Sequence, residues 1–209
     1  MAQHNENQVF TTDLPLMEAF YTLQGEGHFQ GRAAYFIRLA GCDVGCHWCD
    51  VKESWEAAKY PKVNVEEIAR EASQFPSRLT VITGGEPLMY DLTALCRALH
   101  AYGFQINIET SGAYPLSGEL DWICFSPKKF KPPLSEFYEK SNELKIIIYN
   151  SSDFAWAESF ASKMHSNCQL FLQPEWSVMP KVLPKIVEYV KQNPQWRISL
   201  QTHKFMNIP

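Results

Sequence analysis

Strand-like and helix-like segments alternate along most of this chain. Four stretches have apolar residues at helical spacing, at 63–75, 91–103, 153–164 and 182–193. Short runs rich in β-branched and aromatic residues predict strands at 33–39, 79–83, 105–109, 122–126, 143–149, 169–173 and 196–201. This alternation indicates an α/β fold, with a parallel sheet covered by helices. With 209 residues the chain is short for a closed eight-unit barrel, so we expect a partial, open parallel barrel or a doubly wound sheet.

The composition is that of an ordinary globular protein. Hydrophobic residues make up 45% of the chain and charged residues 20%, with a net charge of −4. This charge excludes a basic footprint for nucleic acid or an anionic membrane, and no apolar run is long enough to span a bilayer. The polar start, MAQHNENQVF, lacks an apolar signal region. We therefore expect a cytoplasmic protein with one domain over 1–209 and a loosely ordered start at 1–15.

Three cysteines, Cys42, Cys46 and Cys49, lie close together in the segment GCDVGCHWCD. They could be buried by chance, hold a structural zinc with a fourth ligand from elsewhere, or ligate three irons of an iron–sulfur cluster. The cluster leaves one iron open for a small molecule, and the position directly after strand 33–39 suits such a site. The remaining cysteines, Cys96, Cys124 and Cys168, are best explained as small buried apolar residues.

Polar clusters end five of the predicted strands. They are Thr83–Glu86, Glu109–Gly112, Ser126–Lys128, Gln173–Pro174 and Gln201–Lys204. Because the carboxyl ends of parallel strands meet at one edge of a sheet, we expect these clusters to form one shared site.

The cysteine spacing, with aromatic Trp48 before the third cysteine, resembles the cluster motif of the radical S-adenosylmethionine (SAM) enzymes. The tripeptide Gly84-Gly85-Glu86 after the next strand resembles their second motif, which binds the amino group of SAM. The resemblance implies an abbreviated, partial open parallel (β/α) barrel. It also implies that Cys42, Cys46 and Cys49 hold a 4Fe–4S cluster whose open iron chelates SAM.

A narrower resemblance, to the 7-carboxy-7-deazaguanine synthase family, touches nearly every segment from Tyr21 to Pro209. It rests on YTLQGEG (21–27), GGEP (84–87), ETSG (109–112), SPK (126–128), NELK (142–145) and QTHK (201–204). The family converts 6-carboxy-5,6,7,8-tetrahydropterin to 7-carboxy-7-deazaguanine, with ring contraction and loss of ammonia, on the way to the tRNA nucleoside queuosine. The resemblance further implies a homodimer and an electron donor such as flavodoxin or ferredoxin.

The same resemblance implies two sets of contact residues. Substrate would contact Leu23, Gln24, Gly25, Arg38, Thr83 and Pro209. SAM would contact Trp48, Cys49, Asp50, Gly84, Gly85, Glu86, Ser126, Pro127, Lys128, Gln173, Pro174, Glu175 and Trp176. Chemically, Arg38 offers a bidentate fork to a carboxylate, although a surface salt bridge would explain it too. The terminal carboxylate of Pro209 would suit the guanidine-like edge of a pterin.

One position departs from the family pattern. The family places Asp-Thr after the third cysteine, and the threonine hydroxyl helps to hold Mg²⁺. Here the pair is Asp50-Val51, and valine has no side-chain oxygen, which puts magnesium use or its coordination in doubt. Two other functions compete with the synthase: a radical SAM activase of a glycyl-radical protein, and a non-catalytic zinc protein.

Overall fold

A single curved sheet of nine strands organises the computed structural model, which describes residues 12–209. The strand order is β3-β1-β2-β4-β5-β6-β7-β8-β9. From β2 onward the strands of this sheet run parallel, whereas β1 is antiparallel to both of its neighbours, β2 and β3. The strands are β1 Asp13–Leu23, β2 Ala33–Leu39, β3 Lys62–Asn64, β4 Leu79–Gly84, β5 Gln105–Thr110, β6 Trp122–Phe125, β7 Glu143–Ile148, β8 Gln169–Pro174 and β9 Trp196–Ile198.

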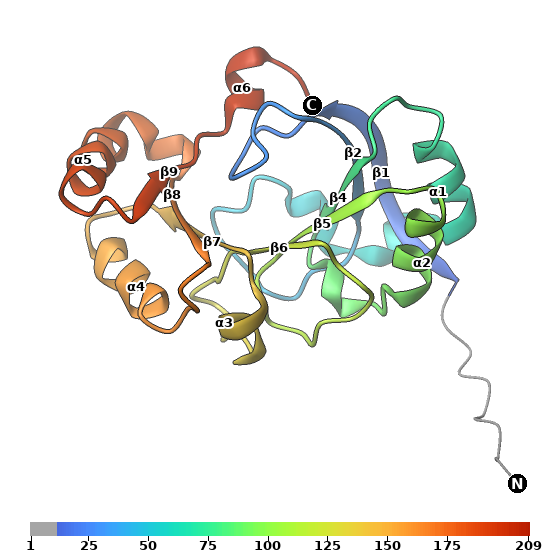
Figure 1. Cartoon of the computed structure of the whole chain (residues 1–209), viewed down its shortest axis with the longest axis horizontal. Coiled ribbons are helices and arrows are strands. Elements are labelled where there is room, and N and C mark those ends of the chain that lie inside the picture. Colours follow the sequence, from blue (N-terminus) through green and yellow to red (C-terminus); the bar gives the residue numbers. More distant parts are fainter. Residues whose placement is uncertain (1–11) are drawn as a thin grey trace, which may run out of the picture.

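The sheet forms an open arc around a group of central loops, and α1 to α5 lie on its outer side (Figure 1). The α-helices are α1 Val65–Ala72, α2 Thr93–Ala101, α3 Glu136–Lys140, α4 Ser152–Ala161, α5 Met179–Gln192 and α6 Thr202–Met206. Short 3-10 turns are η1 Lys52–Trp55, η2 Ala57–Lys59, η3 Pro87–Met89 and η4 Trp176–Val178. No helix within residues 12–209 is long and apolar enough to cross a membrane.

Alternation along β2 shows how the sheet separates the core from the functional side. Ile37 and Leu39 are fully buried in the main hydrophobic core, which the helices cover. Phe36 and Arg38 point to the opposite face and line the central cavity. The sheet therefore buries apolar side chains outward and turns the alternate side chains, both apolar and polar, toward the cavity.

The predicted open parallel barrel is confirmed, and each of the seven predicted strands is present. The four predicted helical stretches contain α1, α2, α4 and α5, although α4 and α5 begin before their predicted ranges. The strands could be recognised in the sequence because parallel strands that are covered on both faces consist mainly of apolar, β-branched residues.

The prediction was wrong at both ends of the described chain. Residues 13–15, expected in a loose start, belong to β1 and pair with β3, whereas residues 1–11 lie outside the described residues. A register shift between Leu16 and Glu18 breaks the alternation of β1, which obscures the strand in the sequence. At the other end, the strand predicted at 196–201 is shorter, because β9 stops at Ile198. Residues 202–206 form α6, which does not follow the strand directly.

Candidate active site

A cavity of about 600 Å³ opens on the inner face of the sheet, at the carboxyl ends of the strands. It brings together nearly all of the residues predicted for cluster, SAM and substrate. Its wall includes Leu23, Gln24, Gly25, Arg38, Cys42, Cys46, Trp48, Cys49, Asp50, Val51, Thr83, Gly84, Gly85, Glu86, Ser126, Lys128, Gln173, Pro174, Glu175, Trp176 and Pro209. Pro127 is a buried neighbour of Ser126 and Lys128 that does not line the wall.

The cysteine loop follows β2 directly, and its three thiols face the cavity. Burial raises the pKa of the Cys46 thiol to about 11; Lys128 opposes this shift, and the neighbouring thiols Cys49 and Cys42 add to it. Iron binding would replace the thiol proton, because the thiolate is the ligand form. Within residues 12–209 no group of three His, Cys, Asp or Glu side chains converges on one metal ion. In a 4Fe–4S cluster each thiolate binds a different iron, so the three cysteines need not converge on one ion.

The Gly84-Gly85 turn at the end of β4 packs directly against the cysteine loop. Gly84 has φ +141°, and a Cβ atom there would lie 2.0 Å from the carbonyl oxygen of Leu39. A Cβ atom on Gly85 would lie 2.2 Å from the carbonyl oxygen of Gly41. The amide of Gly85 donates to Leu39 O at 2.9 Å, and the amide of Glu86 donates to Gly41 O at 2.8 Å. Both glycines are therefore needed for this close approach, and they hold the two motifs side by side.

The Glu86 carboxylate is directed into the protein, where it is 2% exposed. It accepts hydrogen bonds from Thr110 Oγ1 at 2.6 Å, Ser111 N at 2.8 Å and Leu88 N at 3.2 Å, and also from the Ser111 hydroxyl. These four bonds match the acceptor capacity of a carboxylate. Glu86 therefore ties the end of β4 to the end of β5, a role that the sequence did not predict.

Arg38 forms a salt bridge and also faces the cavity, so both roles that the sequence suggested for it remain possible. Its Nε donates to Glu18 Oε1 at 2.6 Å across the β1–β2 pair, which is a salt bridge. Its side chain also lines the cavity, next to Thr83 on the neighbouring strand β4. The terminal guanidinium nitrogens have no hydrogen-bond partner within residues 12–209, so Glu18 orients Arg38 and leaves the outer fork available to an anion.

The loop after β1 is held by two distant segments. Gln24 Nε2 donates to Glu109 Oε1 at 3.1 Å. The carbonyl oxygen of Gly25 accepts from both the amide and the hydroxyl of Thr202, at 3.0 and 2.9 Å. A Cβ atom on Gly25 would lie 2.2 Å from the ring of His203, so only glycine fits against α6 here. The predicted substrate segment is thus fixed by long-range contacts.

The other side of α6 contacts the predicted SAM residues. Lys204 Nζ forms an ion pair with Asp50 at 3.1 Å and lies 5.0 Å from the centroid of the Trp176 ring. Near the rim of the cavity, Thr22 Oγ1 donates to the carbonyl oxygen of Pro209 at 3.3 Å. The segment from α6 onward therefore forms one wall of the cavity.

Lys128 places a partly buried amine near the Cys46 thiol. It donates to the carbonyl oxygen and the hydroxyl of Ser126 at 2.8 and 2.6 Å, and lies 5.9 Å from the centroid of the Trp48 ring. Burial lowers the pKa of Lys128, and the nearby Cys46 opposes this shift. After β8, the Glu175 carboxylate caps η4 by accepting from backbone amides.

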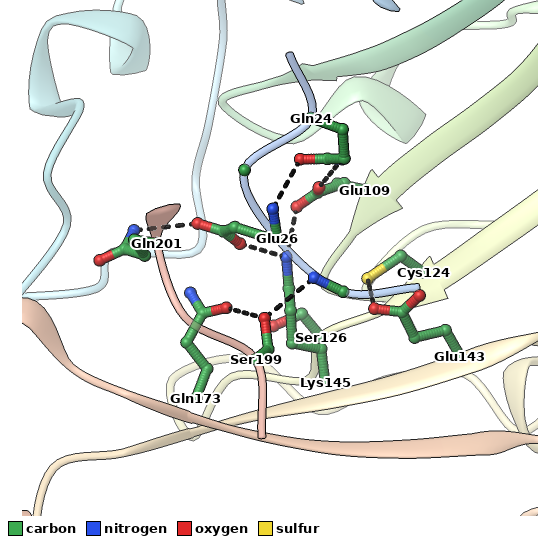
Figure 2. Close-up of polar contacts among 12 residues, drawn as sticks. Gln24, Glu26, Glu109, Cys124, Ser126, Glu143, Lys145, Gln173, Ser199 and Gln201 are labelled. Carbon is green, nitrogen blue, oxygen red and sulfur yellow. Dashed lines mark hydrogen bonds and ion pairs between the residues drawn. The ribbon is translucent and has the colours of Figure 1, made fainter. Parts of the chain in front are cut away.

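Sequence reasoning missed a charged cluster, which we call the floor: Glu26, Glu109 and Lys145 (Figure 2). Lys145 Nζ contacts Glu26 Oε2 at 2.5 Å and Glu109 Oε2 at 2.7 Å, and the lysine side chain is 3% exposed. Gln201 Nε2 also donates to Glu26 Oε1 at 2.9 Å. All of these residues line the cavity. A lysine inside the apolar run ELKIII was the available signal, because charges in buried strands are rare unless they are paired.

Two members of the floor, Glu26 and Lys145, form an ionised pair in the folded protein. Burial alone would raise the pKa of Glu26, but the charge and hydrogen bond of Lys145 lower it to about 2. Burial would likewise lower the pKa of Lys145, but the surrounding negative groups, including Glu109 and Glu26, raise it well above its usual value. Lys145 therefore bridges two carboxyl groups of the cavity wall, and its pair with Glu26 is ionic.

Comparison with known proteins identifies the class and then the family. A family model of the radical SAM superfamily matches residues 36–130, which hold the cysteine loop and the Gly84-Gly85-Glu86 turn, and the fold and site agree with that class. The 7-carboxy-7-deazaguanine synthase of Flavobacterium psychrophilum is 57% identical over 196 residues, covering 94% of this chain and 93% of the relative. That of Synechocystis sp. is 46% identical over 202 residues, covering 97% of each. The chain therefore belongs to the 7-carboxy-7-deazaguanine synthase family.

A solved structure agrees with this assignment. The crystal structure of QueE from Escherichia coli matches with a TM-score of 0.82 at 31% identity, covering 90% of this chain and 93% of that one. The family resemblance read from the motifs is thus confirmed, whereas the roles of individual site residues stay predictions.

Proposed function

We propose that this protein is a radical SAM enzyme that converts 6-carboxy-5,6,7,8-tetrahydropterin to 7-carboxy-7-deazaguanine with ring contraction and loss of ammonia. The observation that carries this proposal is the single cavity that joins the cysteine loop, the Gly84-Gly85 turn, the Arg38 fork and the charged floor. Membership of the family supports the same reaction.

Cluster and SAM are held on one side of the cavity in this proposal. A 4Fe–4S cluster on the three cysteines would supply an electron and an open iron to SAM. The Gly84-Gly85 turn places backbone groups against the cysteine loop, where the amino acid end of SAM would lie. Trp48 and Trp176 both line the cavity; the Lys128 amine lies beside Trp48 and the Lys204 amine beside Trp176.

The substrate lies between Arg38 and the floor in this proposal. The outer nitrogens of Arg38 bind its carboxylate as a bidentate fork, with Thr83 alongside. Gln24 and Gly25 border the pterin from a loop that α6 holds in place. Pro209 lies at the rim and completes the predicted substrate contacts.

The residues after the third cysteine do not fit the magnesium site of the family. Val51 lines the cavity but carries no side-chain oxygen. One oxygen of Asp50 already pairs with Lys204 at 3.1 Å. We therefore propose that Mg²⁺ is bound weakly or is not used by this protein.

Finer properties follow from the family resemblance alone. We propose that one radical SAM domain forms a homodimer and receives electrons from a flavodoxin or ferredoxin. We also propose that the reaction takes place in the cytoplasm and supplies the pathway to queuosine in tRNA.

The test is an anaerobic assay of the reconstituted protein with SAM, a reductant and the carboxypterin. We expect a brown protein that absorbs near 400 nm, as iron–sulfur proteins do, and formation of 7-carboxy-7-deazaguanine. A colourless protein would indicate the zinc alternative. A brown protein that cleaves SAM but leaves the pterin unchanged would refute the synthase and favour the activase.

A further inference from the structure

Strand β1 contains an irregularity that the proposed function leaves unexplained. Leu16 pairs with Leu39 of β2, but the next pair is Glu18 with Arg38, so β1 advances by two residues while β2 advances by one. The residue in excess is Met17. An extra residue of this kind is a β-bulge, and bulges next to active sites often re-aim a side chain.

The bulge turns Glu18 toward the cavity side of the sheet. Residues opposite each other in an antiparallel pair share a face, and so do residues i and i+2 of a regular strand. Leu16 lies opposite Leu39 and packs against the hydrophobic core. Glu18 lies opposite Arg38, whose side chain lines the cavity. Without the extra residue, Leu16 and Glu18 would share one face, and Glu18 would point away from Arg38.

Glu18 is the partner that fixes the Arg38 side chain. Nε of Arg38 donates to Glu18 Oε1 at 2.6 Å, and within residues 12–209 this is the only hydrogen bond of the guanidinium group. The next pair on the same face, Phe20 and Phe36, consists of stacked rings with centroids 5.5 Å apart, which offer the guanidinium no oxygen acceptor. The cavity wall includes Arg38 and both rings but not Glu18, so Glu18 acts on a ligand through Arg38.

The edge of Arg38 that Glu18 occupies decides which edge is left for a ligand. A guanidinium group carries five N–H donors, one on Nε and four on the two terminal nitrogens. With Nε occupied, the terminal nitrogens can still offer two parallel N–H bonds to the two oxygens of one carboxylate. The planar fork is thus held in one orientation before the ligand arrives. A single hydroxyl oxygen cannot receive both bonds in this parallel arrangement.

We propose that Glu18 is a positioning residue that makes the site select a pterin with a carboxylate over one with an uncharged group at the same place. The bulge aims Glu18, Glu18 orients Arg38, and Arg38 binds the carboxylate. This inference rests on the proposed function and adds to it a residue that the predicted substrate contacts do not include.

Two effects of Glu18 on anion binding oppose each other. Its negative charge weakens the attraction between Arg38 and a second carboxylate, but the Glu18 side chain is 46% exposed, so water and salt screen that charge. Its hydrogen bond orders the Arg38 side chain in advance, whereas ordering such a side chain on binding costs about two- to tenfold in affinity. We therefore expect the orienting effect to dominate.

The test compares Glu18→Ala with Glu18→Gln in the cluster-loaded protein with SAM bound and no reductant, so that no turnover occurs. Glutamine removes the charge but keeps an oxygen that can accept from Arg38 Nε, whereas alanine removes both. In calorimetric titration, Glu18→Ala should bind the carboxypterin about three- to tenfold more weakly than Glu18→Gln. The analogue with a hydroxymethyl group in place of the carboxylate should bind equally to the wild type and both variants.

Two controls accompany this comparison. Glu188→Ala removes a surface carboxylate that pairs with Lys191, and it should bind both ligands as the wild type does. A double-mutant cycle shows whether Glu18 acts through Arg38. In an Arg38→Ala background, Glu18→Ala should leave the carboxypterin affinity unchanged, because no guanidinium group remains to be oriented. An equal effect of Glu18→Ala with and without Arg38 would overturn the inference.

The remaining outcomes separate this inference from the proposed function. If Glu18→Ala binds the carboxypterin as tightly as Glu18→Gln, or weakens both ligands by the same factor, the inference is overturned. If the wild type binds no carboxypterin, the proposed function has failed. Nuclear magnetic resonance of the Arg38 Nε–H then still tests the orientation, because this proton should exchange slowly in the wild type and in Glu18→Gln but rapidly in Glu18→Ala. Rapid exchange in the wild type would overturn the inference.

Discussion

Lys145→Met removes the ammonium group that joins Glu26 and Glu109 in the floor of the cavity. The pKa of Glu26 falls from 4.5 to about 2 in the folded protein, a change of about 2.5 pH units, and each unit corresponds to ~1.4 kcal/mol. This gives about 3 kcal/mol for Glu26, and breaking a buried ion pair typically costs about 3–5 kcal/mol. We expect the variant to lose about 3–5 kcal/mol of unfolding free energy at neutral pH.

The loss of unfolding free energy in Lys145→Met should depend on pH. In the wild type, the folded pKa of Glu26 is depressed, so its contribution is present above pH 4.5 and is lost as the pH falls toward about 2. In the variant, burial acts on Glu26 without Lys145, so its folded pKa rises above the unfolded value. Glu26 then takes up a proton as the pH falls from about 8 to about 5. The difference in unfolding free energy between variant and wild type should therefore narrow.

Urea unfolding at about pH 8 and about pH 5, followed by tryptophan fluorescence, measures this difference in unfolding free energy. Lys191→Met is the matched control, because Lys191 pairs with Glu188 on the surface and both side chains are more than half exposed. The control should cost less than about 1 kcal/mol. A Lys145→Met loss as small as that of the control, or one that stays the same at both pH values, would refute the argument for an ionised pair of Glu26 and Lys145.

Three further predictions test the site. Cys46→Ala should abolish the brown chromophore after anaerobic reconstitution, whereas Cys96→Ala should keep it; a colourless Cys96→Ala protein would contradict the ligand assignment. Arg38→Ala should weaken carboxypterin binding by about 2–5 kcal/mol in calorimetric titration while SAM still binds, and unchanged affinity would return Arg38 to its salt bridge with Glu18. Val51→Thr should increase the dependence of activity on Mg²⁺ after chelation, because threonine is close to valine in size and adds a hydroxyl ligand. A wild type that is inactive without Mg²⁺ and fully restored by it would refute this prediction.

The sequence predicted the parallel strands well because each is a short apolar run between turn residues. It did not predict β1, where a register shift after Leu16 interrupts the alternating pattern. The pairing of Asp13 with Asn64 depends on a contact between segments about fifty residues apart, which no local pattern reports. Local patterns in the sequence thus predict the parallel strands, but not the antiparallel strands β1 and β3 at the edge of the sheet.

The same limit applies to the site. The cysteine loop and the Gly84-Gly85 turn were found because their residues are adjacent in the chain. The floor was missed because Lys145 and Glu26 come from β7 and the loop after β1, and only the folded chain makes them an ion pair. Glu86 was recognised as a motif residue, yet three of its four hydrogen bonds inside the protein come from Thr110 and Ser111, at the end of β5.

An open sheet needs other segments to enclose its cavity, and α6 with its flanking residues does so here. The sheet stops at β9, and α6 then lies above the central loops (Figure 1). Its first residue, Thr202, binds Gly25, the preceding Gln201 binds Glu26, and Lys204 binds Asp50 in the cysteine loop. One short segment therefore contacts the substrate loop, the floor and the cluster loop at once. These contacts give the shortened barrel an additional wall, because they hold the segment after β9 against the loops that line the cavity.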